Sequence, residues 1–143
     1  MLTPGDSVFY THNQDSPGTF GPVAVEVIRN LGLIPLVYIG AGTDVRNSSL
    51  DREIREDFYR SKAAIIVLGK GKTWRELGDM WVLPELHSAF STGLECLVYR
   101  TMDVNDEEIE RLRLPVKTVE ISGEDDFRAA IGRDLKRLVT PAN

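Results

Sequence analysis

The sequence contains little of what marks secreted, membrane-bound or disulfide-bonded proteins. It has one cysteine in 143 residues, Cys96, so no internal disulfide can form. Because Cys96 stands in an apolar run, we expect a buried core thiol in a reducing compartment. No apolar segment approaches the ~18 residues that a membrane span needs, and the first residues lack the basic and apolar regions of a signal peptide. We therefore expect a cytoplasmic protein without a membrane partner.

Positive charge and metal ligands are also scarce. The chain has 17 Lys and Arg against 22 Asp and Glu, for a formal net charge of −5. Binding to nucleic acid needs a basic face, so this balance argues against nucleic acid as the main partner. The two histidines and one cysteine offer no zinc-like spacing, and no metal is expected. The remaining composition, 42% hydrophobic and 27% charged, is that of a globular protein, and the length predicts one domain over residues 1–143.

Apolar runs alternate with amphipathic segments along the chain. The runs predict strands at residues 7–11, 34–39, 63–68, 94–99 and 116–121, the last a half-exposed edge strand. The amphipathic segments predict helices at residues 20–31, 50–58, 84–90 and 103–112 and one helix with Phe127, Ile131, Leu135 and Leu138 on one face. This alternation predicts an α/β protein with a flavodoxin-like three-layer sandwich, in which a five-stranded parallel sheet has the order 2-1-3-4-5.

Several residues predict local features of this fold. The unbroken hydrophobicity of residues 63–68 predicts a strand that is buried on both faces. Pro35 suits the start of a strand or an edge strand, and Gly32 suits the end of a helix. Ser122 and Asp125 have the spacing of a capping box at the start of the last helix.

Glu85 is the strongest candidate for a catalytic residue. It falls in the first turn of the predicted helix 84–90, after the buried strand 63–68. Ligands of open α/β sheets bind beyond the carboxyl ends of the strands. A carboxylate there can accept hydrogen bonds from ribose hydroxyls or stabilise positive charge at an anomeric carbon. The alternative is a carboxylate that only stabilises the helix N-terminus.

Candidate nucleotide contacts surround the end of the first predicted strand. His12 follows that strand and can titrate near neutral pH, although a lone histidine is more often a hydrogen-bonded loop residue. Asp15, Gly18 and Thr19 join the strand to a helix N-terminus, where backbone amides can hold a diphosphate. Trp81 either packs in the core or stacks on nicotinamide or adenine.

The order of four motifs resembles a known family. The motifs are Val8-Phe9-Tyr10-Thr11-His12, Leu31-Gly32-Leu33, Ser61 before a hydrophobic strand, and Trp81, Glu85, Ala89 and Gly93 at intervals of four. Together, between residues 7 and 99, they resemble a TIR (Toll/interleukin-1 receptor) domain of bacterial type.

This resemblance implies a function. In NAD-cleaving TIR domains the matching glutamate is catalytic, so the resemblance assigns that role to Glu85, with NAD or a related nucleotide as substrate and no required cofactor. It also implies self-association, for which residues 40–49 are the expected contact. The E-x-x-x-A-x-x-x-G spacing is also similar to nucleoside 2-deoxyribosyltransferases, which break the same type of bond. A non-catalytic interaction module is the remaining alternative, because Tyr38-Ile39-Gly40 replaces the family's acidic residue after the second strand.

Overall fold

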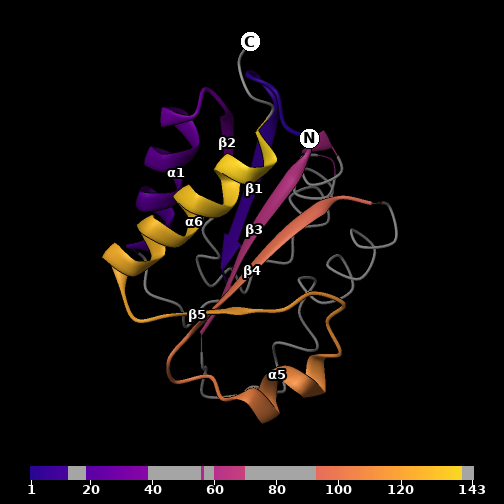
Figure 1. Ribbon diagram of the computed structural model, residues 1–143, viewed down its shortest axis with the longest axis vertical. Coiled ribbons are helices and arrows are strands. Elements are labelled where there is room, and N and C mark those ends of the chain that lie inside the picture. The colour runs from indigo at the N-terminus through magenta and orange to yellow at the C-terminus, as the bar shows by residue number, and fades with distance from the viewer. Residues whose placement is uncertain (13–18, 39–55, 57–59, 70–92, 140–143) are drawn as a thin grey trace.

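Five parallel strands form one sheet in the computed structural model (Figure 1). The structure describes residues 1–12, 19–38, 56, 60–69 and 93–139. Its elements are β1 (Ser7–His12), α1 (Phe20–Asn30), β2 (Ile34–Tyr38), β3 (Ala63–Leu68), β4 (Glu95–Thr101), α5 (Asp106–Leu112), β5 (Val119–Ile121) and α6 (Glu124–Leu138). The strand order β2-β1-β3-β4-β5 confirms the predicted flavodoxin-like α/β fold and its topology.

The burial of each strand follows its place in the sheet. β3 lies at the centre between β1 and β4, and all six of its residues are buried, as predicted. β2 is an edge strand, and Pro35 stands opposite Val8 near its start. Proline is tolerated there because a missing N–H costs least at an edge. β5 forms the other edge and is only partly buried, but its three residues are half the predicted length.

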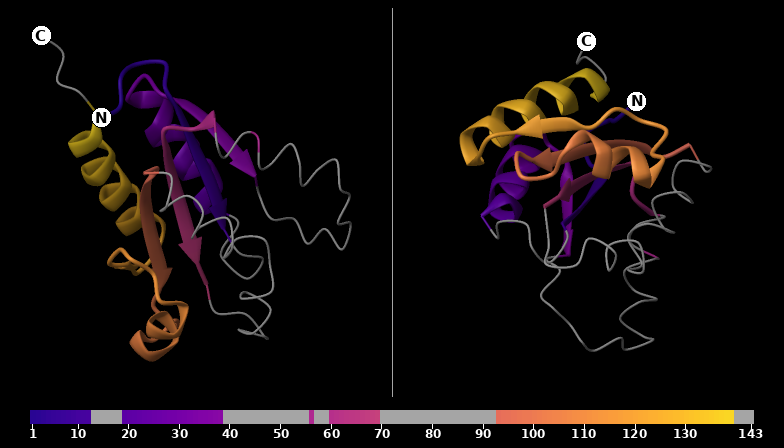
Figure 2. Two further views of the ribbon diagram at one scale, coloured as in Figure 1. Left: turned by 90° about the vertical axis from the view of Figure 1, so that its right-hand side faces the viewer. Right: turned by 90° about the horizontal axis from the view of Figure 1, so that it is seen from below.

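Helices α1 and α6 pack side by side on one face of the sheet (Figures 1 and 2). Phe127 of α6 lies at the centre of the core between them, with ring centroids 4.9 Å from Phe20, 5.5 Å from Tyr99 and 6.4 Å from Tyr10. Residues on the opposite face of the sheet, such as Ile66, are buried as well. Two buried faces are what a parallel sheet requires.

The ends of the two helices test the predicted caps. After α1, Gly32 has a φ of +76°, and its N–H donates to the carbonyl of Arg29 at 3.0 Å, which confirms the predicted helix end. The capping pair Ser122–Asp125 is wrong by one residue. Asp126 accepts hydrogen bonds from the backbone N–H of Ser122 at 2.8 Å and from its hydroxyl at 3.3 Å. Because Gly123 is the N-cap, Asp126 occupies the third helical position, from which a carboxylate reaches back over the helix start.

Other boundaries differ from the sequence prediction at polar residues. β1 extends to His12 and β4 to Thr101, because both continue the parallel pairing with β3 or β5. α5 begins at Asp106 instead of residue 103. The predicted helix 84–90, and residue range 50–58 apart from Glu56, lie outside the described residues. In the part of the chain that the structure describes, no helix combines the length and the apolar character that crossing a membrane requires.

Both ends of the described chain lie at the amino end of the sheet. Leu2 pairs with Val139 in a parallel bridge, and its N–H donates to the carbonyl of Leu138 at 2.6 Å. α5 lies at the other end, after the carboxyl end of β4 (Figure 1). The carboxyl edge, where the sequence predicts the functional site, is therefore opposite to the chain ends.

Candidate functional site at the carboxyl edge of the sheet

The strand order reverses direction between β1 and β3, which creates a switch point at the carboxyl edge. β1 and β3 are neighbours in the sheet, whereas the chain passes from β1 to β2 on the opposite side. His12, the last residue of β1, stands opposite Val67 of β3. Doubly wound sheets bind their ligands at this position, because the two connections leave in opposite directions and open a crevice.

His12 is held at this switch point by Tyr10. The two residues are two positions apart on β1, so their side chains share the face that α1 and α6 cover. The hydroxyl of Tyr10 lies 2.8 Å from Nδ1 of His12, and the rings meet edge-on with centroids 5.5 Å apart. Tyr10 is fully buried, and His12 is 4% exposed. This hydrogen bond therefore fixes the orientation of the imidazole.

Burial also sets the protonation of this pair. It lowers the pKa of His12 below its usual value and raises that of Tyr10 above its usual value. Both groups are therefore neutral at pH 7. The sequence prediction of a loop histidine that titrates near neutral pH needs correction, because His12 belongs to the strand and its burial disfavours the charged imidazolium.

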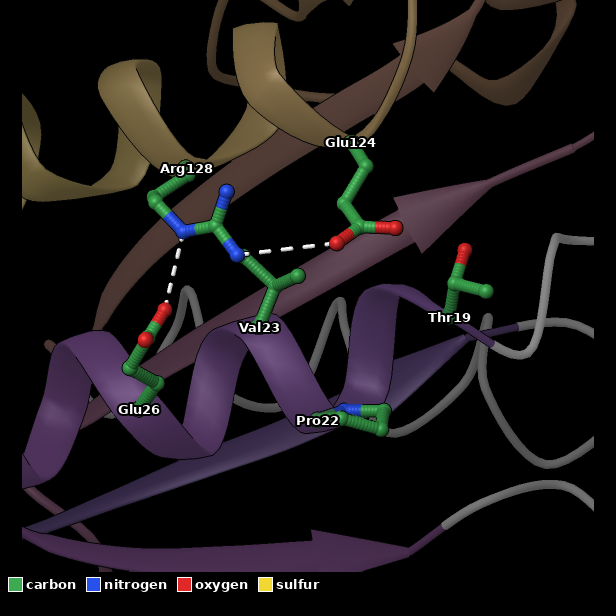
Figure 3. Close-up of a pocket in the computed structure, with 6 residues that line it drawn as sticks. All are labelled: Thr19, Pro22, Val23, Glu26, Glu124 and Arg128. Carbon is green, nitrogen blue, oxygen red and sulfur yellow. Dashed lines mark hydrogen bonds and ion pairs between the residues drawn. The ribbon is translucent and has the colours of Figure 1, made fainter.

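Thr19 lines a pocket of about 300 Å³ between the N-terminal turns of α1 and α6 (Figure 3). Thr19 is the N-cap of α1, and its side chain makes no capping hydrogen bond. The other lining residues are Pro22, Val23, Glu26, Glu124 and Arg128.

Arg128 is the cation around which the carboxylates of this pocket gather. Its Nε donates to Glu26 at 2.8 Å, and one terminal nitrogen lies 3.5 Å from Glu124 (Figure 3). The other terminal nitrogen lies 3.1 Å from Asp125, which does not line the pocket. Each pair is exposed, so solvent screens it and it contributes little to stability. Among the residues that line the pocket, the two carboxylates Glu26 and Glu124 outnumber the single guanidinium of Arg128. The pocket therefore favours a cationic ligand group over a phosphate.

Arg100 forms a second charged group at the carboxyl end of β4. Its guanidinium pairs with Asp106 of α5, lies 3.6 Å from Glu120 of β5 and donates to the carbonyl of Val104 at 3.3 Å. The neighbouring Asp103 accepts a hydrogen bond from Thr101. Here too, carboxylates outnumber the cation, because Arg100 contacts both Asp106 and Glu120.

The Nε of Arg100 is buried, and no hydrogen-bond partner for it exists in the part of the chain that the structure describes. A buried donor without a partner costs about 1–3 kcal/mol. Sequence reasoning missed Arg100 because it ended the strand at Tyr99. β4 continues for two residues beyond Tyr99, which places Arg100 opposite Glu120, and no sequence pattern marks that pairing.

Tyr99 makes the polar contact that anchors α6 on the sheet. Its hydroxyl donates to Oδ2 of Asp134 at 2.8 Å, and burial is the main cause that raises its pKa. The Asp134 side chain is 12% exposed and also lies 3.1 Å from Arg133 and 3.8 Å from Arg137. The two partners are 35 positions apart, so no local pattern predicts them.

The remaining predicted residues divide into two groups. Cys96 is confirmed as a buried free thiol, 8% exposed, and burial raises its pKa to about 12. Glu85, Trp81, Asp15 and Gly18 lie outside the described residues, so their roles stay predictions. Within the described ranges, no group of three or more metal-ligating side chains comes together.

No protein-family model matches the chain, and no curated protein matches it. The strand order establishes the fold, and the likeness to TIR domains rests on the sequence motifs alone.

Proposed function

We propose that this protein binds NAD or a related nucleotide at the carboxyl edge of the sheet and cleaves its N-glycosidic bond. The observation that carries the proposal is the β1–β3 switch point, where a fixed, neutral His12 ends β1. The motif of Trp81, Glu85 and Ala89 follows β3 in the sequence, in the connection that leaves the same edge.

The chemistry assigns one role to each residue. The carboxylate of Glu85 accepts hydrogen bonds from the ribose hydroxyls and stabilises the oxocarbenium-like transition state. The bond between the anomeric carbon and the nicotinamide nitrogen breaks, and its electron pair stays on the nitrogen. A water oxygen then bonds to the anomeric carbon and releases a proton. Trp81 stacks on the nicotinamide or adenine ring.

Charge at the edge supports a substrate with a cationic base. The groups around Arg100 and Arg128 each carry more carboxylates than guanidinium groups. The oxidised nicotinamide ring is a cation, and positive charge persists on the ribose in the transition state. Negative potential from both groups favours these species over a neutral product, although salt screens it beyond about 8 Å.

The test is release of free base by the purified protein. We expect nicotinamide from NAD, at a rate that rises more steeply than linearly with protein concentration if subunits complete each other's sites. Glu85→Gln should lower the rate about 100-fold or more. Glu95→Gln is the matched control, because Glu95 is an exposed carboxylate at the amino end of β4, and it should leave the rate unchanged.

Other outcomes separate the alternatives. Base released from deoxynucleosides but not from NAD would favour the deoxyribosyltransferase-like activity. No base from any of these substrates, at any protein concentration, would refute the enzymatic proposal and favour the interaction module. Full activity of Glu85→Gln would remove Glu85 from the mechanism.

A further inference from the structure

Helix α5 has little support from packing. It has seven residues, and isolated helices shorter than about 12–15 residues are marginal in water. It lies beyond the carboxyl end of β4 and makes no extensive contact with any other described helix or strand (Figures 1 and 2). Of the α5 side chains that the structure describes, only Ile109 is partly buried, whereas those of Asp106, Glu107 and Arg111 are 85%, 75% and 68% exposed. Burial of an apolar face, which stabilises most helices in proteins, therefore contributes little to α5.

The turns at the two ends of α5 show what its opening would change. Before the helix, Val104 is 1% exposed, and its N–H donates to the carbonyl of Thr101 at 3.1 Å. After the helix, Arg113 has a φ of +50°, which is unfavourable for any residue other than glycine, and its N–H donates to the carbonyl of Glu110 at 3.1 Å. Opening would relax the backbone of Arg113. Among the described side chains it would withdraw Val104 and the partly buried Ile109 from their contacts.

Arg100 connects α5 to the sheet. Its backbone belongs to β4 and stands opposite Leu68 of β3 and Glu120 of β5. Its guanidinium pairs with Asp106, the first residue of α5, and donates to the carbonyl of Val104 at 3.3 Å. The same guanidinium lies 3.6 Å from Glu120, which belongs to the sheet. Because Glu120 would stay in place if α5 moved away, loss of Asp106 would not leave the 13% exposed Arg100 side chain without a carboxylate.

We propose that residues 102–112 form a flap at the carboxyl edge, which opens while the sheet stays folded, and that Arg100 is its latch. In the closed state Arg100 holds Asp106 and the carbonyl of Val104, and in the open state it holds Glu120. Opening therefore changes the group around Arg100 from two carboxylates to one. The position of the flap then sets how strongly this part of the edge attracts a cationic group. This device is independent of the proposed function.

Thiol labelling of the Val104→Cys variant tests the opening. The variant has two thiols, the introduced one and Cys96 of β4, which is 8% exposed and serves as the internal control for opening of the sheet. Val104 is 1% exposed, so burial alone predicts that the introduced thiol reacts no faster than Cys96. Because the flap exposes position 104 and leaves the sheet folded, we expect the introduced thiol to react at least about tenfold faster than Cys96. A rate equal to or below that of Cys96 overturns the flap.

Hydrogen exchange tests the opening in the unmodified protein, so it decides the question even if Val104→Cys disturbs the fold. After correction for intrinsic rates, the amides of α5 should exchange at least about 100-fold faster than the central amides of α6. Exchange of α5 at the rate of α6 would show that the two helices open only together, and it overturns the flap.

The latch is tested by hydrogen exchange of charge variants. Asp106→Asn should speed exchange of α5 about threefold to tenfold and leave α6 unchanged. Glu107→Gln is the matched control: it removes the same charge from the same helical turn, but its partner, 3.1 Å away, is Arg111 of α5 itself. It should change exchange of α5 less than about twofold. In an Arg100→Gln background with unchanged exchange of α6, Asp106→Asn should add less than about twofold. Equal effects of Asp106→Asn and Glu107→Gln, or an undiminished effect of Asp106→Asn without Arg100, overturn the latch.

Discussion

The hydrogen bond between Tyr99 and Asp134 should contribute more to stability than any exposed ion pair of α6. Tyr99→Phe tests this, because the ring is fully buried and the substitution keeps its volume and its edge-on contact with Phe127 at 5.5 Å. Only the hydroxyl, 2.8 Å from Oδ2 of Asp134, is lost.

The expected magnitude follows from the state of Asp134. A hydrogen bond to a charged group contributes about 1.5–3 kcal/mol. The Asp134 side chain is 12% exposed and keeps Arg133 at 3.1 Å, so water and that guanidinium replace part of the lost contact. We therefore expect Tyr99→Phe to lower the free energy of unfolding by about 1.5–2 kcal/mol. For a chain of this length that corresponds to a fall in Tm of about 5–8 °C.

Urea unfolding of a double-mutant cycle measures this contribution. In an Asp134→Ala background the hydroxyl of Tyr99 has lost its acceptor, so Tyr99→Phe should cost less than about 0.5 kcal/mol. Asp125→Ala is the control on the same helix, because Asp125 is fully exposed, and the loss of its pair with Arg128 should change the urea midpoint far less than Tyr99→Phe does. Equal costs of Tyr99→Phe in both backgrounds would show that the contact does not anchor α6.

Two further predictions concern buried titratable groups. Burial lowers the pKa of His12, so below about pH 6.5 the unfolded chain binds more protons than the folded protein, and stability should fall as the pH drops further. Urea midpoints between pH 8 and 5.5 should show this decline, and a decline of the same size in His12→Gln would assign it to other groups. Cys96, 8% exposed with its pKa raised to about 12, should react with a thiol reagent at least about 100-fold more slowly in the native protein than in urea. Rapid labelling of the native protein would contradict its burial.

The sequence was informative where one residue type has one structural use. Gly32 predicted the end of α1 because a φ of +76° favours glycine, and Pro35 predicted the start of a strand or an edge strand because proline lacks the N–H that a central strand needs. The unbroken apolar run of β3 predicted a strand that is buried on both faces. The alternation of apolar runs with amphipathic segments predicted the strand order.

Polar residues at strand ends were difficult to assign to strands from the sequence. His12, Arg100 and Thr101 belong to strands, yet by composition each resembles the start of a loop. Their strand character comes from backbone pairing with a neighbour, which a single sequence does not contain. The contact of Tyr99 with Asp134 joins residues 35 positions apart and was unpredictable for the same reason. Glu85 was predicted from its place in the expected helix 84–90 and from the motif spacing, and Trp81 from the motif spacing, so these predicted residues and the described geometry come from different parts of the chain.

The charges at the carboxyl edge favour one orientation of the proposed ligand. On one side, α1 and α6 place Glu26, Glu124 and Asp125 around a single Arg128, and on the other, α5 and β5 place two carboxylates around Arg100. Both groups repel an anionic diphosphate and attract a cationic nicotinamide. Under the proposed function, these charges favour the orientation in which the scissile bond lies toward the carboxylates of the edge and the diphosphate lies away from them.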